Sequence, residues 1–346
     1  MKTCQVVILN WNGADMLRRF LPSVVEHSQA FTTSRGESCS VEVVVADNGS
    51  TDDSLTVLSS FPSVRTTLLD RNYGFAEGYN RALAHTTADY TVLLNSDVQV
   101  TPRWLEPVIN YMEEHAEVVA AQPKILAHAS LHEHPHRFEH AGAAGGFIDI
   151  LGYPFCRGRV LATVEDDHGQ YDTLTDIFWA SGACLLCRTQ AYHDAGGLDP
   201  AFFAHMEEID LCWRLQALGH RIVCVPQSEV FHVGGGSLSY ESPRKTYLNF
   251  RNNLLMLYKN LPSRRLWWVM TCRLVLDYVA ALQLFLTGQR ANAKAAVQAR
   301  RDYHRLRRQY RAIRQQLQKS YTNPLPDTIK NRSIIFAYYL LGKKTY

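Results

Sequence analysis

Residues 41–52 read Val-Glu-Val-Val-Val-Ala-Asp-Asn-Gly-Ser-Thr-Asp. A nearly continuous run of valines, without regular alternation with polar residues, is typical of a strand covered on both faces by helices. Similar short apolar runs lie on both sides of this stretch, at residues 4–9, 66–69 and 90–94. Between these runs, apolar residues have helical spacing at residues 14–27, 53–60 and 74–85. The alternation predicts a doubly wound α/β fold with a mostly parallel sheet, whose ligands bind at the carboxyl ends of the strands.

The composition is that of a folded globular protein. The chain has 346 residues, of which 46% are hydrophobic and 20% charged, and its net charge is +3. This length predicts a large sheet domain, residues 1–241, and a helical C-terminal region, residues 242–346. Basic residues concentrate in residues 290–319, where Asp302 is the only acid. This asymmetry is informative about partners, whereas the small net charge gives no indication of nucleic-acid binding.

The cysteines and the N-terminus predict a cytoplasmic protein. Eight cysteines are scattered without a disulfide-like pattern, as is usual in a reducing compartment. Cys184 and Cys187 have a spacing known from metal and redox sites, but residues 183–187, which overlap the strand predicted at 176–186, have the pattern of a strand, on which their thiols would lie on opposite faces. Met1-Lys2-Thr3 leads directly into the first strand, so we expect no signal peptide.

The apolar stretch 266–286 has two charges near its middle, Arg273 and Asp277. Each would cost about 2.5–3.5 kcal/mol in a membrane-spanning helix. The sequence therefore predicts a core or interfacial helix in which the two residues pair across one turn. Trp267, Trp268 and the basic segment that follows favour docking on an anionic membrane. A solvated appendage or a homo-oligomer interface explains the same pattern, and both interpretations remain open.

Three polar motifs follow strands of the predicted sheet. Asp47 ends the strand quoted above and could accept a hydrogen bond from the imide of uracil or thymine, although the polar residues after it could equally cap the next helix. Residues 72–80, Asn-Tyr-Gly-Phe-Ala-Glu-Gly-Tyr-Asn, begin a helix. Its small residues and its N-terminus favour a diphosphate, or else tight packing on the sheet. Asp97 follows the strand at 90–94, where a carboxylate suits either Mg²⁺ or a buried turn.

A cluster of acids, Glu207, Glu208 and Asp210, lies among residues that have the pattern of a buried helix face. Acids are rarely buried unless they are paired, metal-bound or held for chemistry. The cluster is therefore the strongest candidate for a catalytic group in the chain.

Histidines form two further features. Residues 128–140 contain five histidines with irregular spacing, which favours a solvated loop over a metal site. A strand is predicted at 221–225, ending before Pro226. His232 comes shortly after it and precedes glycines at 234–236, a pattern that predicts an exposed histidine beside a loop able to close over a ligand.

The order of the motifs is more specific than any one of them. From the N-terminus they are Asn10-Trp11-Asn12, Asp47-Asn48-Gly49-Ser50, Asn72-x-Gly74-Phe75-Ala76, Asn95-Ser96-Asp97, Glu207-Glu208-Ile209-Asp210-Leu211-Cys212-Trp213-Arg214 and His232. This series resembles the family 2 glycosyltransferases of the GT-A fold, and within them the bacterial rhamnosyltransferase-like branch. The resemblance covers about residues 6–232, and the helical C-terminal third matches less specifically.

The resemblance implies a role for each matching residue. Trp11 would stack on the nucleobase that Asp47 binds, and the other nucleotide-sugar contacts would be Asn10, Asn12, Asn72, Gly74, Phe75, Gly78, Asn80, Asn95 and Ser96. Asp97 and His232 would bind a divalent metal, Mg²⁺ or Mn²⁺, although Asn95 replaces the first Asp of the family's Asp-x-Asp motif. Glu208 would be the catalytic base at a position where the family usually has Asp, with Asp210 and then Glu207 as alternatives. Trp179, Ser181 and Gly182 would line the acceptor side.

The resemblance also implies an activity. The expected reaction is inverting transfer of a sugar, rhamnose-like in preference, from a dTDP- or UDP-sugar to a hydroxyl of a glycan or lipid-linked glycan. It would serve cell-surface polysaccharide synthesis in the cytoplasm or at the inner face of the cytoplasmic membrane. One alternative is a nucleotidyltransferase, which usually has a basic Gly-rich loop where this chain has Asn10-Trp11-Asn12-Gly13. Another is a non-catalytic scaffold at the membrane, which the intact acidic cluster argues against.

Overall fold

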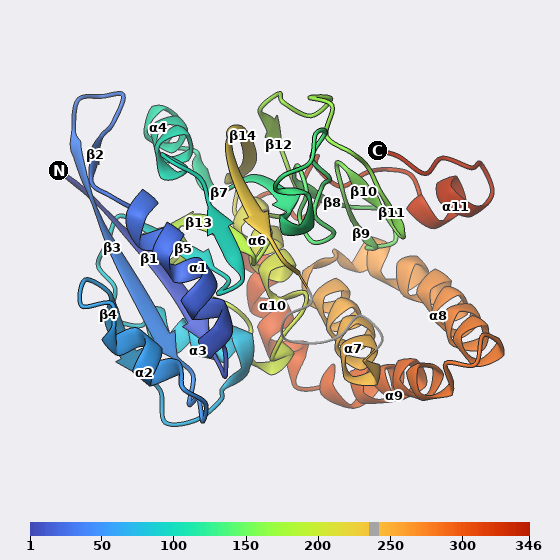
Figure 1. Cartoon of the computed structure of the whole chain (residues 1–346). Helices are drawn as coiled ribbons and strands as arrows, with labels where there is room; N and C mark the ends of the chain where they lie inside the picture. The colour runs from blue at the N-terminus through green and yellow to red at the C-terminus, as the bar shows by residue number, and fades with distance from the viewer. Residues whose placement is uncertain (235–241) are drawn as a thin grey trace.

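The computed structural model describes residues 1–234 and 242–346 and shows a mixed central sheet with helices on both faces (Figure 1). The glycine-rich loop expected after His232 lies largely outside the described residues. In spatial order the strands are β12 (Thr175–Asp176), β14 (Arg221–His232), β7 (Val118–Ala127), β13 (Cys184–Arg188), β5 (Tyr90–Leu94), β1 (Lys2–Asn10), β3 (Ser38–Asp47) and β2 (Phe31–Thr32), with β4 (Arg65–Leu68) beside β3 and β6 (Val98–Val100) beside β14.

The N-terminal half of the sheet is parallel, as the strand–helix alternation predicts. β5, β1, β3 and β4 run in one direction, so their carboxyl ends meet at one edge. β13 then runs antiparallel to both β5 and β7, which makes the complete sheet mixed. This antiparallel insertion places the residues just before β13 beside those just after β5.

The apolar side chains form a core on each face of the sheet. One core contains residues of α1 (Ala14–His27), α2 (Ser54–Ser59) and α4 (Leu105–Glu114). The other contains residues of α3 (Gly74–Leu83), α5 (Thr189–Asp194) and α6 (Glu207–Ala217). Cys184 belongs to the first core and Cys187 to the second, which confirms that the two thiols of β13 lie on opposite faces.

Two strand predictions were wrong in extent. The expected strand at 176–186 is interrupted, because the chain leaves the sheet after β12 and bonds at Trp179 to Gly146 of a second, antiparallel sheet before β13 begins. That sheet has the order β11 (Thr163–Val164), β10 (Arg159–Val160), β9 (Pro154–Cys156) and β8 (Gly146–Ile148). The strand expected to stop before Pro226 continues to His232, because a register shift between Val225 and Glu229 accommodates the proline.

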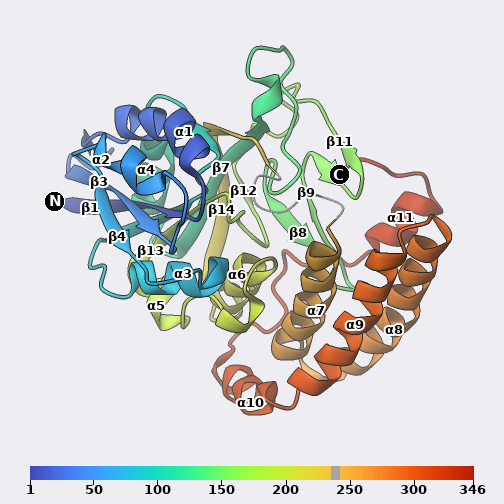
Figure 2. The same cartoon turned by 60° about the horizontal axis from the view of Figure 1, so that its bottom comes forward.

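The C-terminal region is helical and packs against the sheet domain on the side of α6 (Figure 2). Its helices are α7 (Pro243–Asn260), α8 (Ser263–Leu286), α9 (Arg290–Leu306), α10 (Tyr310–Ser320) and α11 (Ile334–Tyr339). Leu254, Leu255 and Leu257 of α7 belong to the same core as α6. The boundary at residue 241 stays a prediction, but the two parts share one core and both contribute to the site described next.

Candidate active site

The carboxyl ends of β1 and β3 place Asn10 beside Asp47, which are partners in the parallel register. The Asn10 side-chain amide donates to Asp47 Oδ1 at 3.0 Å, and the Ser50 backbone amide donates to Asp47 Oδ2 at 2.9 Å. Each carboxylate oxygen can accept a further hydrogen bond. Asn12 adopts a left-handed φ of 50° and accepts from the Thr51 amide at 2.7 Å, which links the two strand ends. Trp11, between them, is 50% exposed and offers a ring face to solvent.

The start of α3 does not offer its amides to a diphosphate, which corrects one expectation. The Gly74 amide donates to Asn72 Oδ1 at 2.8 Å, and the Phe75 and Ala76 amides donate to the Phe203 carbonyl at 2.7 and 3.2 Å. An added Cβ at Gly74, whose φ is +78°, would lie 2.4 Å from the Phe203 ring. The small residues here therefore serve the close approach of the loop that contains Phe203.

Gly78 and Asn80 also have packing roles in place of the expected donor contacts. An added Cβ at Gly78 would lie 2.8 Å from Leu9 of β1, so the helix lies tightly on the sheet. The Asn80 amide donates to the Leu198 carbonyl at 2.7 Å, and its oxygen accepts from the Leu198 amide and the Tyr192 hydroxyl. Its hydrogen-bonding groups are thus engaged by the turn that leads to the acidic cluster.

Asp97 and His232 lie together, as the sequence analysis expects of a metal pair. β14 brings His232 opposite Val98 of β6, and His232 Nε2 lies 3.1 Å from Asp97 Oδ1. Glu139, which the sequence analysis missed, lies on the other side of the ring, with Oε1 3.5 Å from His232 Nδ1. All three side chains are buried, so the prediction of an exposed His232 was wrong. Burial would lower the pKa of His232, but its hydrogen bond to Asp97 and the nearby carboxylate of Glu139 raise that pKa to about 10.

The sequence contains only a weak signal for Glu139. This residue lies near the end of the histidine-rich segment 128–140, which was predicted to be a solvated loop. In the structure Glu139 is buried, and the His140 beside it is half-buried, so this end of the segment belongs to the site.

A divalent cation between Asp97 and His232 would replace the proton that His232 Nε2 donates to Asp97, and would take further ligands from a phosphate. Two neighbouring ligands of an octahedral ion, each about 2.1 Å from it, lie about 3.0 Å apart, close to the 3.1 Å between His232 Nε2 and Asp97 Oδ1. Asn95 Nδ2 also lies 3.5 Å from His232 Nε2. Within residues 1–234 and 242–346, three or more His, Cys, Asp or Glu side chains do not gather around one cation position. An ion here would depend on oxygens of a bound diphosphate.

The acidic cluster is presented by a strained turn at the start of α6. Phe203, His205 and Met206 all have positive φ, between 65° and 73°, and such non-glycine residues each cost about 1–3 kcal/mol. The Asn252 side-chain amide of α7 donates to the carbonyls of Phe202, Ala204 and His205 at 2.7–2.9 Å. The helical C-terminal region therefore holds the turn from which Glu207 and Glu208 project.

Glu208 has the properties of a general base. Its side chain is half-buried, and its Oε2 makes no hydrogen bond within the described part of the chain. Burial raises its pKa to about 7, and a base is most effective when its pKa is close to the working pH. For Glu207, which is 4% exposed, burial and the adjacent charge of Glu208 raise the pKa well above its usual range. Both effects favour the protonated form of Glu207.

Asp210, the second candidate base, does not fit that role. It is fully buried, its Oδ2 lies 2.6 Å from Lys259 Nζ and 2.9 Å from Arg214 Nε, and its Oδ1 accepts from Asn260 at 2.8 Å. Burial would raise the pKa of Asp210, but Lys259 and Arg214 lower it below its ordinary value. This carboxylate is a fixed anion that joins α6 to α7.

The three residues expected on the acceptor side divide into one that adjoins Glu208 and two that do not. An added Cβ at Gly182 would lie 3.9 Å from Glu208 Cβ and 3.2 Å from the Phe75 ring. Trp179 is buried under Gly146 and donates to the Phe147 carbonyl at 3.0 Å. Ser181 is buried as well and donates to the Ala141 carbonyl at 2.5 Å. The latter two are structural.

The two halves of the site are connected through β5 and β13. Asn95 lies two residues before Asp97, and its backbone N–H donates to the Ala183 carbonyl at 3.0 Å. Ala183 directly follows Gly182, which adjoins Glu208. The cation pair and the base are therefore joined through one strand junction, at which Gly182 adjoins both Phe75 and Glu208.

The sequence of this chain is similar to those of known glycosyltransferases. The family described as Glycosyl transferase family 2 matches residues 5–176. The N-acetylglucosaminyl-diphospho-decaprenol L-rhamnosyltransferase of Mycobacterium tuberculosis is 28% identical over 244 residues, which cover 66% of this chain and 75% of that protein. The rhamnosyltransferase WbbL of Escherichia coli is 27% identical over 168 residues, which cover 46% of this chain and 61% of WbbL.

Solved structures support the fold assignment. GalNAc-T7 with UDP, GalNAc and Mn²⁺ superposes with a TM-score of 0.57 at 15% identity, covering 88% of this chain and 55% of that one. Residues 1–349 of TarS from S. aureus in complex with UDP superpose with a TM-score of 0.52 at 16% identity, covering 92% and 87%. These likenesses show the GT-A fold, in agreement with the motif order and with the enzyme class. Residues 5–176 of the chain are therefore a domain of glycosyltransferase family 2.

Proposed function

We propose that this glycosyltransferase moves a sugar from a nucleoside diphosphate to a hydroxyl of a lipid-linked glycan, with inversion at the anomeric carbon. The observation that carries the proposal is the position of Glu208. Its carboxylate has a pKa of about 7, has an oxygen without a hydrogen-bond partner among the described residues, and adjoins Phe75 and Gly182. The strand junction beside it leads to Asp97 and His232.

Glu208 would act on the acceptor. Its carboxylate takes the proton of the acceptor hydroxyl, whose oxygen forms a bond to the anomeric carbon while the bond from that carbon to the diphosphate oxygen breaks. The electron pair of the broken bond leaves with the nucleoside diphosphate. A positioned base of this kind contributes roughly 10²–10⁴-fold to the rate, and a single displacement inverts the anomeric centre.

Asp97 and His232 would act on the leaving group. They would hold Mg²⁺ or Mn²⁺, which when bound supplies positive charge to the departing diphosphate. Glu139 Oε1 lies 3.5 Å from His232 Nδ1, the position from which carboxylates commonly orient metal-binding histidines.

Asp47 and Asn10 would recognise the base of the donor, and Trp11 would cover it. The carboxylate oxygens of Asp47 are acceptors for the imide N–H that uracil and thymine share, so UDP- and dTDP-sugars both fit. The relatives named as rhamnosyltransferases favour a rhamnose-like sugar. The decaprenol in the name of the mycobacterial relative favours a lipid-linked acceptor and cell-surface polysaccharide synthesis at the inner face of the cytoplasmic membrane.

The test is transfer from a panel of dTDP- and UDP-sugars to a synthetic prenyl-diphosphate-linked N-acetylglucosamine, with Mn²⁺, Mg²⁺ or EDTA. We expect turnover with one donor class and loss of turnover in EDTA, and NMR of the product should show an inverted anomeric centre. A chain that binds none of the nucleotide sugars in calorimetry would contradict the proposal. Binding without transfer to any acceptor would favour the scaffold alternative.

A further inference from the structure

α8 has the reverse of the usual amphipathic arrangement, because its charges face the protein and its apolar side chains face solvent. Arg273 and Asp277 are 2% and 5% exposed. Arg273 Nε lies 3.1 Å from Asp277 Oδ1, and the same guanidinium donates to the Leu151 carbonyl at 3.2 Å. Arg300 of α9 lies 3.2 Å from Asp277 Oδ2. The buried side of α8 is thus bonded to two other parts of the chain.

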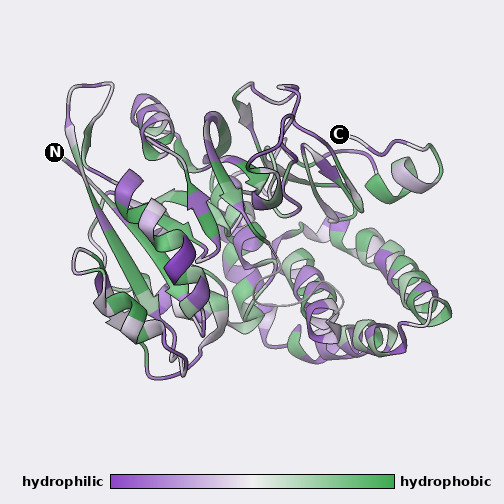
Figure 3. Cartoon of the chain, viewed as in Figure 1, coloured by the Kyte–Doolittle hydropathy of each residue, from purple (hydrophilic) through white to green (hydrophobic). Residues whose placement is uncertain are grey.

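The opposite side of α8 is an apolar stripe, green along the helix in Figure 3. Its members, each between 42% and 73% exposed, are Trp267, Leu274, Val275, Tyr278, Val279, Leu282, Phe285 and Leu286. From residue 266 to residue 286 the helix has charges only at the two buried positions. A stripe this long, about 30 Å at 1.5 Å per residue, is unusual on a protein surrounded by water alone.

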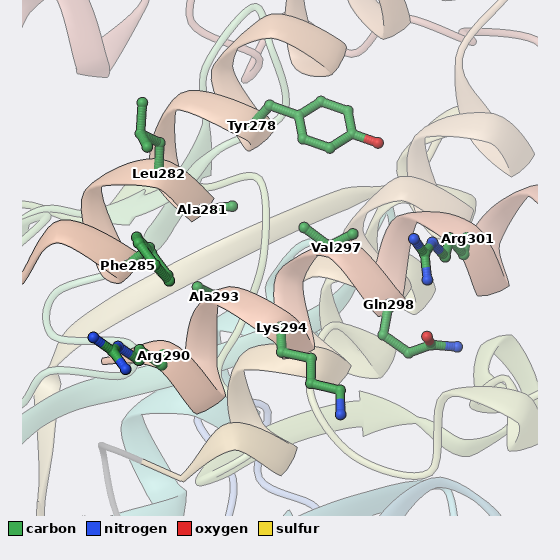
Figure 4. Close-up of a pocket in the computed structure, with 10 residues that line it drawn as sticks. All are labelled: Tyr278, Ala281, Leu282, Phe285, Arg290, Ala293, Lys294, Val297, Gln298 and Arg301. Carbon is green, nitrogen blue, oxygen red and sulfur yellow. The ribbon is translucent and has the colours of Figure 1, made fainter. Parts of the chain in front are cut away.

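A basic edge runs beside the apolar stripe. A groove of about 510 Å³ lies between α8 and α9, with Tyr278, Leu282 and Phe285 on one side and Arg290, Lys294 and Arg301 on the other (Figure 4). The three basic residues are exposed and recur along one face of α9.

Acids do not offset this charge. Residues 263–319, all of them described, contain the acids Asp277 and Asp302 only, and both are buried. Asp302 moreover accepts from Tyr247 at 2.8 Å. The exposed surface of this stretch is therefore apolar and cationic.

We propose that the exposed face of α8, with the basic edge of α9, docks on the surface of an anionic phospholipid bilayer. The apolar stripe enters the interface, the tryptophan at its N-terminal end takes the headgroup level that this residue prefers, and the guanidinium and ammonium groups contact lipid phosphates. Charge complementarity favours this occupant over a second copy of the chain, because two copies meeting through this face would bring their cationic edges together.

Docking is distinct from spanning. α8 is the one helix of the described residues that is long and apolar enough to cross a membrane, with a mean hydropathy of 1.6 over its best window. Crossing would remove Asp277 from Arg300 and Arg273 from the Leu151 carbonyl and from Asn253. Both charges remain paired when the helix lies on the bilayer, so the observed packing fits the interfacial arrangement alone.

The experiment is flotation of the full chain with vesicles of phosphatidylcholine alone or with 30% phosphatidylglycerol, a composition chosen to supply anionic headgroups, at low and high salt. No nucleotide sugar is present, so the outcome is independent of the proposed transfer reaction. We expect binding to the anionic vesicles at low salt and little binding to the neutral ones. Failure to float with anionic vesicles at low salt would overturn the proposal.

Two sets of variants locate the surface. Leu282→Glu with Phe285→Glu should weaken partitioning by roughly 10-fold or more, since burying one such side chain is worth about that factor. Arg290→Gln with Lys294→Gln and Arg301→Gln should weaken it by roughly 100-fold, since each basic residue near the surface contributes about fivefold. All five side chains lie on the surface, and unchanged melting temperatures should show that folding is retained.

Matched controls come from residues 35–103 of the sheet domain, which lie across the molecule from α8 and α9 (Figures 1 and 2). Leu55→Glu with Leu68→Glu removes equally exposed leucines, and Arg35→Gln with Arg65→Gln and Arg103→Gln removes equal charge. Both controls should float like the unaltered chain. Equal loss in controls and test variants would overturn the assignment to α8, as would a dimer in sedimentation velocity that only Leu282→Glu with Phe285→Glu dissociates.

Discussion

The side chain of Glu208 is subject to two opposing requirements. Burial beside Gly182 and Phe75 disfavours its charged form, which raises its pKa to about 7. Catalysis requires the charged form, because only a carboxylate can take the acceptor proton. Burial and the charge of Glu208 favour the neutral form of Glu207, whereas Lys259 and Arg214 favour the charged form of Asp210. The pKa values of three acids within four residues are therefore set by three different surroundings.

Glu208→Gln should lower kcat by roughly 10²–10⁴-fold, because the amide cannot accept the proton. The Kd of the donor, measured by calorimetry, should change less than about threefold, because the donor contacts lie at the ends of β1, β3 and β5. Glu207→Gln is the matched control, since it makes the same change to the neighbouring acid, and kcat should stay within about threefold. If instead Glu207→Gln removed turnover and Glu208→Gln did not, the base would be Glu207.

The pKa of Glu208 also predicts a link between pH and stability. Between its ordinary value of 4.5 and about 7 the folded chain binds a proton there that the unfolded chain has lost, so this group makes the free energy of unfolding fall as pH rises. Glu208→Gln should therefore be more stable than the unaltered chain at pH 8, by roughly 3 kcal/mol. The difference should vanish near pH 4.5. Guanidinium unfolding at the two pH values measures it, and a variant that is less stable at pH 8 would contradict the assigned pKa.

Asp97→Asn should weaken donor binding only when a divalent ion is present. Asparagine keeps the size of the side chain but removes the one carboxylate of the proposed cation pair, and Asn95 is already neutral. We expect the Kd of the donor with Mn²⁺ to rise at least 10-fold, while the Kd in EDTA stays the same. Asp52→Asn, at the start of α2 away from His232, is the comparison variant. Equal weakening with and without the ion would mean that Asp97 contacts the donor directly.

At the scale of helices and strands, local patterns predicted most of the sheet domain. α1 has the predicted limits, Ala14 to His27, and β5 those of its apolar run, Tyr90 to Leu94, because apolar spacing alone determines both. The start of α3 was assigned to a diphosphate, since the sequence near Gly74 cannot reveal that the Phe203 carbonyl accepts its first amides. For the same reason the sequence could not show the packing contacts of Trp179 and Asn80. Their partners are distant in sequence, and a polar motif does not show whether a neighbour already satisfies it.

α7 supports the active site through the side chain of Asn252. Asn252→Leu should remove the three hydrogen bonds that hold the strained turn before α6. We expect kcat to fall about 10-fold or more, with the donor Kd nearly unchanged, because the turn positions Glu208 and not the nucleotide site. Asn249→Leu, one turn earlier on α7, is the control and should keep its kcat. If Asn252→Leu changed stability but not kcat, the turn would not depend on α7 for its working geometry.

At the scale of the whole molecule, the C-terminal region completes the fold of the sheet domain. Asp210 of α6 is paired with Lys259 of α7, and the Lys259 ammonium also lies 2.8 Å from Asp199. The Thr322 and Asn323 amides donate to the Ala217 carbonyl at the end of α6. Asp210 and Lys259, 49 positions apart in sequence, are thus buried together. The C-terminal helices thereby hold α6, which bears Glu208.

Lys259→Ala should therefore destabilise the entire chain and not the helices alone. It leaves the buried Asp210 with Arg214 as its one remaining cation, and loss of one partner of a buried ion pair costs about 3–5 kcal/mol. Arg103→Ala, which breaks an exposed pair with Glu106, should cost less than about 1 kcal/mol. Guanidinium unfolding followed by tryptophan fluorescence and by circular dichroism should give coincident single transitions. A chain ending at residue 241 that folds alone and binds the nucleotide would refute this interdependence, since its α6 would lack Lys259, Asn260 and the packing of α7.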